Sequence, residues 1–157
     1  MAGGDVRPYL QTTYEASPLN RPVAQHGVGE AWVEHPVSYQ YITRDPRSFS
    51  WLYYKIPSGN FLGVCTTDED GNPAYEFKDG LGRTILAGRM DGSDPYFVYY
   101  QYNNHDDLVN VYPPFVTYPK MHEPEGPFDT QSSYSYRYDF LHRCVYKKLP
   151  ERDAIYY

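Results

Sequence analysis

The sequence predicts an all-β fold of consecutive antiparallel β-hairpins, with little or no helix. The chain has 157 residues, of which 19 are tyrosine, 14 proline and 12 glycine. Aromatic side chains favour strands, whereas proline and glycine mark the turns between them. Aromatic and polar residues also alternate along several segments, as in strands with a period of two. This length allows one domain, whose core must consist largely of rings because long aliphatic residues are few.

Two regions are expected along the chain. Residues 1–36 are predicted to be an irregular segment, because prolines and glycines recur there every few positions and leave no room for a long helix. Within it, residues 14–21 (YEASPLNR) allow one short turn at most. Residues 37–157 are predicted to form the β-hairpin repeat region.

Alternating residues in the second region predict a series of strands separated by turn-forming residues. The predicted strands cover residues 37–41, 49–56, 61–67, 74–78, 84–89, 96–102 and 108–112. Turns are predicted at 68–72, 79–83, 91–95 and 103–107, where Asp, Asn and Gly favour the conformations of tight turns. Residues 115–132 are predicted to be a polar loop, and 134–150 a last strand-turn-strand unit. A further strand is predicted to start within 153–157 with no closing segment, which favours a piece of a longer chain.

The segment DEDGN at 68–72 carries carboxylates at alternate positions, as calcium loops do. An EF-hand loop ends in a bidentate glutamate and has a helix on either side. Asp79 stands where that glutamate would be, and strands are predicted on both sides. A hairpin turn is therefore favoured over a calcium site, and no metal or other cofactor is expected.

Three segments share one pattern: aromatic, any residue, aromatic, Asp or Asn, a turn, and then Arg or its replacement at the start of a new strand. The pattern is carried by Tyr75, Phe77, Asp79, Gly82 and Arg83, then by Tyr100, Tyr102 and Asn103, and finally by Tyr136, Tyr138, Asp139 and Arg143. Lys78 is an extra residue in the first segment, and Asp107 replaces Arg in the second. The Asp can accept hydrogen bonds from its own turn and a charge-assisted bond from the Arg. The tyrosines are then expected to pack against the next hairpin.

The third segment, Tyr136-Arg137-Tyr138-Asp139 and onward to Pro150, resembles the YD repeats of bacterial Rhs (rearrangement hotspot) proteins, insecticidal toxin complexes and teneurins. The DGLGR run at 79–83 matches the same repeat core. Residues 14–21, 67–72 and 111–114 are similar to segments that are common in Rhs-type proteins upstream of their core. The resemblance extends over most of the chain, from about residue 9 onward.

This resemblance implies a non-enzymatic structural role. In such proteins the repeats form a long β-sheet ribbon that spirals into a hollow shell, which encloses a C-terminal toxic domain until delivery. The chain would be a fragment of a shell wall, with neighbouring YD repeats and an enclosed toxin domain as partners, secreted or at the surface of a bacterium. Two departures stand out: His142 occupies a position where the repeat usually has Gly, and the middle segment lacks both the Asp and the Arg.

Composition argues against several classes of partner. The net charge is −6 and no cluster of Lys or Arg stands out, which disfavours nucleic acid. No apolar run is long enough to span a membrane, and the N-terminus has no signal-peptide pattern. Cys65 and Cys144 lie far apart in sequence, and two buried free thiols are favoured over the single possible disulfide.

Enzyme motifs are missing from the sequence. The 5 histidines show neither HxH nor HExxH spacing, and GxSxG, GxxxxGK and GxGxxG are absent. His105 with Asp106 and Asp107 could perform acid-base chemistry, but a polar turn is favoured there. Cys144 and His142 share one side of a predicted strand without a third group to orient them, so packing is favoured over a nucleophile. The chain is therefore not expected to be an enzyme.

An aromatic-rich β module that binds carbohydrate or protein is the alternative to a scaffold. Trp32, Trp51, Tyr53 and Tyr54 could form a platform that stacks on sugar rings. The exposure of the aromatic residues discriminates between the two, because a scaffold turns its rings inward and a lectin-like site presents a row of rings to solvent.

Overall fold

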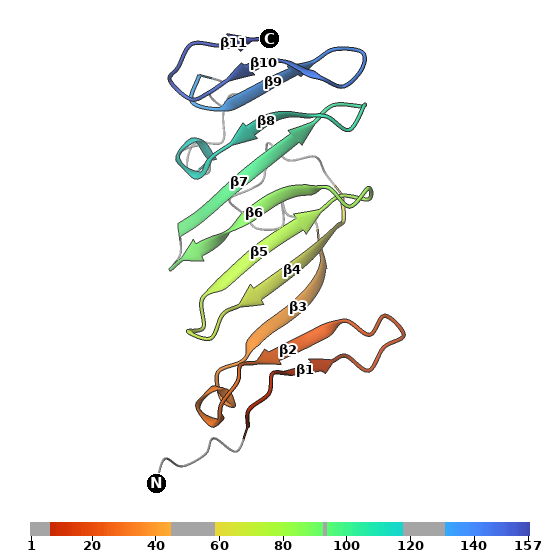
Figure 1. Cartoon of the computed structure of the whole chain (residues 1–157), viewed down its shortest axis with the longest axis vertical. Helices are drawn as coiled ribbons and strands as arrows, with labels where there is room; N and C mark the ends of the chain where they lie inside the picture. The colour runs from red at the N-terminus through yellow and green to blue at the C-terminus, as the bar shows by residue number, and fades with distance from the viewer. Residues whose placement is uncertain (1–6, 45–58, 93, 118–130) are drawn as a thin grey trace.

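The computed structural model describes residues 7–44, 59–92, 94–117 and 131–157. In this part of the chain, eleven β-strands form one antiparallel sheet in which each strand pairs with its neighbours in the sequence, as Figure 1 shows. The strands are β1 (Gln11–Tyr14), β2 (Pro22–His26), β3 (Val37–Arg44), β4 (Phe61–Thr67), β5 (Pro73–Lys78), β6 (Thr84–Asp91), β7 (Asp94–Tyr102), β8 (Leu108–Tyr112), β9 (Tyr134–Tyr138), β10 (Cys144–Lys148) and β11 (Ile155–Tyr156). The prediction of an all-β fold is confirmed, with one short 3-10 turn, η1 (Glu30–Trp32), and helical residues at 114–117.

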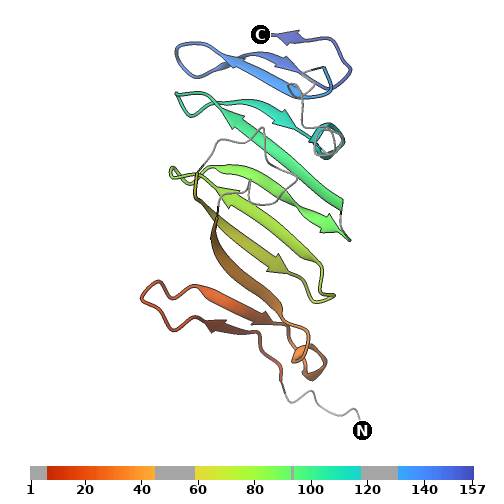
Figure 2. The same ribbon diagram turned by 180° about the vertical axis from the view of Figure 1, so that it is seen from behind.

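The turns lie alternately at the two ends of the strands. The turns that connect β1 to β2, β5 to β6, β7 to β8 and β9 to β10 lie at one end, at the right in Figure 1 and at the left in the reverse view of Figure 2. We call this row of strand ends the hairpin edge, as distinct from the edge strands β1 and β11. The turn between β4 and β5 lies at the opposite end of the strands.

The expectation that residues 1–36 are irregular requires correction, because β1 and β2 form a hairpin there. Gln11 pairs with His26 and Thr13 with Ala24, and β2 then pairs with β3. Pro22, one of the prolines that leave no room for a long helix, is the first residue of β2, at a bulge in the ladder with β1. Proline is tolerated at the first position of a strand, where a missing N–H disrupts no continuous ladder.

The predicted strands after residue 60 all appear, with small differences in length. β3 continues to Arg44 and β6 to Asp91, beyond the alternating patterns that indicated them. The predicted strand at 49–56 lies outside the described residues. The predicted loop at 115–132 overlaps the helical residues 114–117.

The core lies on one face of the central strands. A buried row runs across four strands, because Phe77 pairs with Leu86, Leu86 with Tyr99 and Tyr99 with Tyr112. The rings of Tyr99 and Tyr112 stack with centroids 5.7 Å apart. Val116, from the helical residues after β8, joins the same cluster. This core is predominantly aromatic, as the composition predicts.

A glycine permits the close packing of this core. Gly63 in β4 pairs with Ile42 on one side and with Phe77 on the other. A Cβ atom at Gly63 would lie 2.6 Å from Ile42 Cγ1 and 2.7 Å from Phe77 Cε1. The ring of Phe77 therefore covers a position that any larger residue would block.

Candidate functional site

Four turns of the sheet share one backbone geometry. Each has five residues, at 68–72, 79–83, 103–107 and 139–143, and in each the first N–H donates to the fifth carbonyl and the fourth N–H to the first carbonyl. These bonds measure 3.0 to 3.3 Å. The fourth residue has a positive φ in every case: Gly71 (85°), Gly82 (81°), Asp106 (68°) and His142 (60°). This is a type I turn followed by a residue in the left-handed region, a common three-residue hairpin loop.

The first residue of each turn holds the loop with its side chain. Its Oδ1 accepts hydrogen bonds from the N–H groups of the third and fifth residues at 2.8 to 3.0 Å. Short Asp and Asn side chains are well suited to this role. The four residues that occupy the position are Asp68, Asp79, Asn103 and Asp139. The segment DEDGN thus forms the predicted hairpin turn. It is a fourth copy of the turn geometry found in the three segments that share the repeat pattern.

The fifth residue closes two of these turns with an ion pair. Arg83 Nε donates to Asp79 Oδ2 at 2.7 Å, and Arg143 Nε donates to Asp139 Oδ2 at 2.8 Å. Burial by itself would raise the pKa of Asp79, but the bonds from Arg83 and from the turn N–H groups hold it below its usual value. The N–H and side chain of Arg143 likewise lower the pKa of Asp139.

The turn at 103–107 reverses these roles. Asn103 still accepts the backbone bonds through Oδ1, but its Nδ2 donates to Asp107 Oδ2 at 3.0 Å. The negative charge has therefore moved from the first residue to the fifth. Hydrogen bonds from Asn103 and then from His142 keep the pKa of Asp107 below its usual value.

The turn between β1 and β2, at residues 15–21, is a longer version of the same unit. The N–H of Glu15 donates to the carbonyl of Arg21 at 2.9 Å, and Asn20, directly before Arg21, has a positive φ of 48°. Arg21 Nε and Nη2 contact the two Glu15 carboxylate oxygens at 2.8 and 2.9 Å. This bidentate pair lowers the pKa of Glu15 to about 2.

Successive hairpins are joined by one recurring contact. The hydroxyl of a tyrosine donates a 3.0 Å hydrogen bond to the carbonyl of the residue that follows the preceding turn on this edge. The three pairs are Tyr41 with Pro22, Tyr102 with Thr84, and Tyr138 with Leu108. In the first two pairs, an arginine guanidinium also lies over the tyrosine ring in a cation–π contact, with Arg21 Cζ 4.0 Å and Arg83 Cζ 4.7 Å from the ring centroid.

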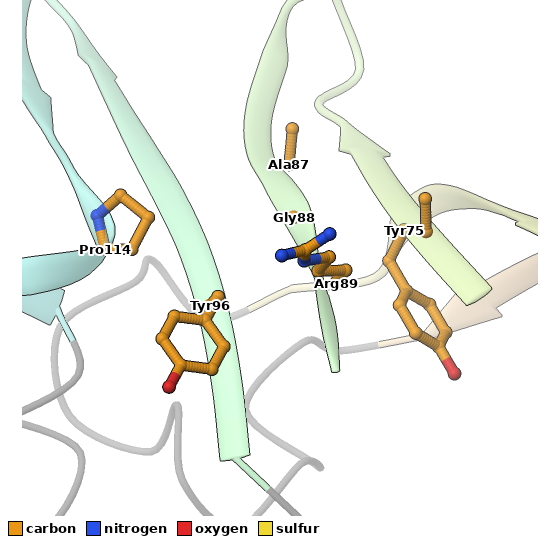
Figure 3. Close-up of a pocket in the computed structure, with 7 residues that line it drawn as sticks. Tyr75, Ala87, Gly88, Arg89, Tyr96 and Pro114 are labelled. Carbon is orange, nitrogen blue, oxygen red and sulfur yellow. The ribbon is translucent and has the colours of Figure 1, made fainter. Parts of the chain in front are cut away.

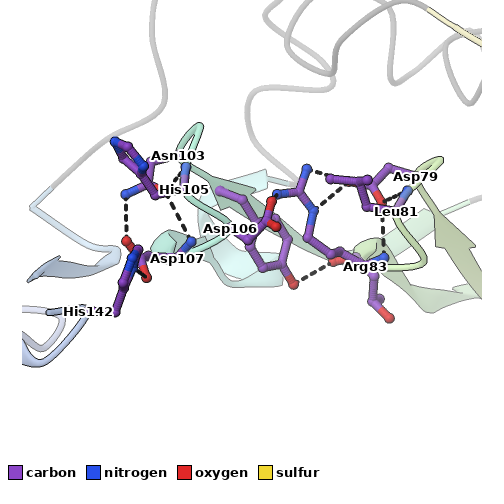
Figure 4. Close-up of polar contacts among 10 residues, drawn as sticks. Asp79, Leu81, Arg83, Asn103, His105, Asp106, Asp107 and His142 are labelled. Carbon is purple, nitrogen blue, oxygen red and sulfur yellow. Dashed lines mark hydrogen bonds and ion pairs between the residues drawn. The ribbon is translucent and has the colours of Figure 1, made fainter. Parts of the chain in front are cut away.

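Charged side chains link the same turns along the hairpin edge (Figure 4). Arg83, fifth in its turn, contacts Asp106, fourth in the next, at 2.6 Å between Nη1 and Oδ1. Asp107, fifth in that turn, contacts His142, fourth in the following one, at 2.8 Å between Oδ1 and Nδ1. The signs are inverted at the second junction, where the cation is a histidine that is charged only when protonated.

The strand register corrects the alignment of the first repeat segment. Phe77 pairs with the third residue after its turn, Leu86, as Gln101 pairs with Asn110. Lys78 in the first segment is therefore equivalent in position to Tyr102 in the second, and it is not an extra residue of the turn. As a result Phe77 is fully buried in the core, whereas Tyr102 and Tyr138 are half-buried at the junctions between hairpins. Tyr75 packs against the core, and Tyr100 and Tyr136 are half-buried.

Other predicted residues fall outside this arrangement. Trp32 lies in η1 and is exposed, while Trp51, Tyr53 and Tyr54 lie outside the described residues, so the proposed platform is not described as a whole. Cys65 is buried and Cys144 half-buried, and both thiols are free. A shallow depression of about 500 Å³ lies instead over β6, and its lining includes Tyr75, Gly88, Arg89 and Tyr96 (Figure 3).

The described residues contain no cluster of three His, Cys, Asp or Glu side chains placed to hold a metal ion. His105 sits in a turn whose acids are engaged in structural contacts, and its ring lies 6.0 Å from that of His142. Within the ranges that the structure covers, no helix is long and apolar enough to cross a membrane.

Comparison with known proteins gives a partial match. The profile of a domain of unknown function, DUF6443, matches residues 2–43. This range covers the β1–β2 hairpin, η1 and most of β3. No curated protein matches the sequence.

Sequence reasoning missed the partners of the tyrosines more than the turns themselves. Tyr41 and Arg21 were not assigned to the repeat, although Arg21 follows Asn20 as Arg83 follows Gly82. The usable signal was an arginine directly after a residue that tolerates a left-handed conformation. The tyrosine that stacks on it is 20 residues away in the first case and 19 in the second, so local pattern could not pair them.

Proposed function

We propose that this chain is a non-enzymatic structural scaffold, a fragment of a shell built from YD repeats of the Rhs type. The observation that supports this most is the recurrence of one junction along the hairpin edge. A tyrosine hydroxyl meets the carbonyl after the preceding turn at 3.0 Å in three places. Repeated junctions between successive units are how repeat proteins distribute their stability.

Several charged side chains are engaged in the turns and in the links between them. The carboxylates of Asp79 and Asp107 hold their turns, and Arg83 spans from its own turn to the next. Under this proposal the partners are neighbouring YD repeats and, by resemblance to the family, an enclosed C-terminal toxin domain. A secreted or surface location in a bacterium is part of the same proposal.

A binding module remains the second candidate, because one observation favours it. The depression over β6 is mostly apolar and combines two tyrosines with Arg89, a composition that suits a sugar ring or a peptide. This candidate would act through that surface, whereas the scaffold would act through the edges of its sheet.

Sedimentation of the isolated chain, with far-UV circular dichroism on the same sample, tests the scaffold proposal. The outer strands β1 and β11 are short and exposed, and unpaired strand edges promote association. A scaffold fragment is expected to associate or to fold incompletely. A β-rich monomer over a wide concentration range would contradict the proposal and favour the binding module, whose ligand could then be sought by glycan and peptide arrays with Tyr96→Ala as the matched variant.

A further inference from the structure

The last turn on the hairpin edge is closed by an arginine, like the turns whose arginines lie over a tyrosine ring. Arg143 closes the turn at 139–143 as Arg83 closes the turn at 79–83. Its side chain is 70% exposed, whereas those of Arg83 and Arg21, each covered by a tyrosine ring, are 26% and 38% exposed. The face of the guanidinium that a tyrosine ring covers at two other turns is thus exposed to solvent at this one.

The strand register identifies which position would face Arg143. In each junction with a tyrosine, the third residue after the turn pairs with the residue three positions before that tyrosine: Ala24 with Ser38, Leu86 with Tyr99, and Asn110 with Ser135. β11 follows the same rule, because Tyr146, third after Arg143, pairs with Tyr156. By this rule the tyrosine that faces Arg143 would lie three positions beyond Tyr156, which is the second position after Tyr157.

We propose that Arg143 and the carbonyl of Cys144 form a docking site for a tyrosine, carried by a further hairpin that continues β11 in its present register. The tyrosine ring would lie on the Arg143 guanidinium, and its hydroxyl would donate to the Cys144 carbonyl. An Asp or Asn would follow it and begin the next turn. Tyr157 would then hold the place of Tyr136 and Tyr100, two residues before the docked tyrosine.

The inference rests on the proposed scaffold function, since it names the partner that the edge of such a scaffold accepts. The proposed occupant is a hairpin in line with β11. A second copy of the chain is the competing occupant, because Tyr14 precedes Glu15 as Tyr138 precedes Asp139, and it is 52% exposed. That occupant would have to displace β11 from Tyr146 and Lys147.

A double-mutant cycle on an extended chain tests the proposal. The full chain is lengthened after Tyr157 by a duplicate of residues 137–148, which places a tyrosine at the second added position. Four proteins are compared: the extended chain, its variant with that added tyrosine changed to Ala, the extended chain with Arg143→Ala, and the double variant. Unfolding by urea is followed at a concentration where sedimentation shows a single species.

The expected result is coupling between the two substitutions. A tyrosine on an exposed arginine should contribute about two- to fivefold to the unfolding equilibrium constant, and that contribution should vanish once either partner is removed. The matched control changes the added copy of Tyr146 to Ala, which lies on the return strand and should show no coupling with Arg143. Additive effects in the main cycle would overturn the proposal.

Two further outcomes separate this inference from the function on which it rests. Coupling in an extended chain whose parent is a stable monomer would retain the docking site and contradict the scaffold. Concentration-dependent association of the parent chain that Tyr14→Ala and Arg143→Ala each abolish would assign the site to a second copy, which overturns the hairpin as occupant and leaves the scaffold in place.

Discussion

Removing the hydroxyl groups of Tyr102 and Tyr138 tests whether the recurring junction stabilises the sheet. Tyr102→Phe keeps the ring over Arg83 but deletes the 3.0 Å bond to the Thr84 carbonyl. A hydrogen bond of this kind contributes about 1 kcal/mol net, and the partly buried carbonyl loses its partner. We expect a loss of about 1 kcal/mol for Tyr102→Phe and a similar loss for Tyr138→Phe. The double variant should depart from strict additivity, because Leu108, which accepts the bond from Tyr138, is the strand partner of Tyr102.

The assay is urea unfolding followed by circular dichroism. With a slope of roughly 1 to 3 kcal/mol per M urea, each single substitution should lower the midpoint by roughly 0.3 to 1 M. Tyr100→Phe and Tyr136→Phe are the matched controls, since they lie two residues earlier on the same strands and are also half-buried. They should change stability by less than about 0.5 kcal/mol. Equal losses for all four variants would refute the reasoning, because position in the junction would then not matter.

Three further predictions concern the turns and the core. Stability should be retained above the ordinary carboxylate pKa range and lost as pH falls through the lowered folded-state pKa values, since the folded state binds fewer protons; the urea midpoint measured between about pH 7 and pH 2 checks this, and a flat profile would contradict it. His142→Gly should stabilise by up to about 1 kcal/mol by relieving a left-handed φ, seen as a higher urea midpoint; an unchanged or lower midpoint would show that the contact of His142 with Asp107 outweighs the strain. Gly63→Ala should cost about 1 to 3 kcal/mol because its Cβ would overlap Ile42 and Phe77, whereas Gly80→Ala, with no atom within 4 Å, should be near neutral in the same denaturation assay.

Much of the strand order could be predicted because its signals are local. Alternation with a period of two marks β4 to β10, and the Asp and Gly residues between them specify tight turns within a few positions. The β1–β2 hairpin was missed because its turn is longer and begins with Glu15 in place of Asp. A Glu side chain can still close a turn when an arginine reaches it in a bidentate contact, which proline-rich composition does not reveal.

The register of the repeat could not be read from the aromatic pattern alone. Tyr75 and Phe77 resemble Tyr100 and Tyr102 in spacing, yet Lys78 shifts them by one residue relative to the turn. A one-residue shift moves every side chain to the opposite face of a strand. Phe77 therefore belongs to the core and Tyr102 to a junction, a distinction that depends on the pairing partners and so on residues distant in sequence.

The middle repeat departs from the sequence pattern, yet it keeps the same turn geometry and the same link to the next turn. Asn103 supplies the same oxygen to the turn as an Asp would, and Asp107, which accepts a hydrogen bond from Asn103 Nδ2, restores the acid that Asn103 lacks. Because Asp107 replaces an arginine, the link to the next turn starts from an acid, and its partner is His142, whose Nδ1 lies 2.8 Å from Asp107 Oδ1. The histidine that replaces the usual glycine and the aspartate that replaces the usual arginine thus compensate for each other. Asp107→Arg alone should weaken the junction because His142 loses the carboxylate that it contacts, and Asp107→Arg combined with His142→Asp should recover it, since that pair reproduces the contact of Arg83 with Asp106.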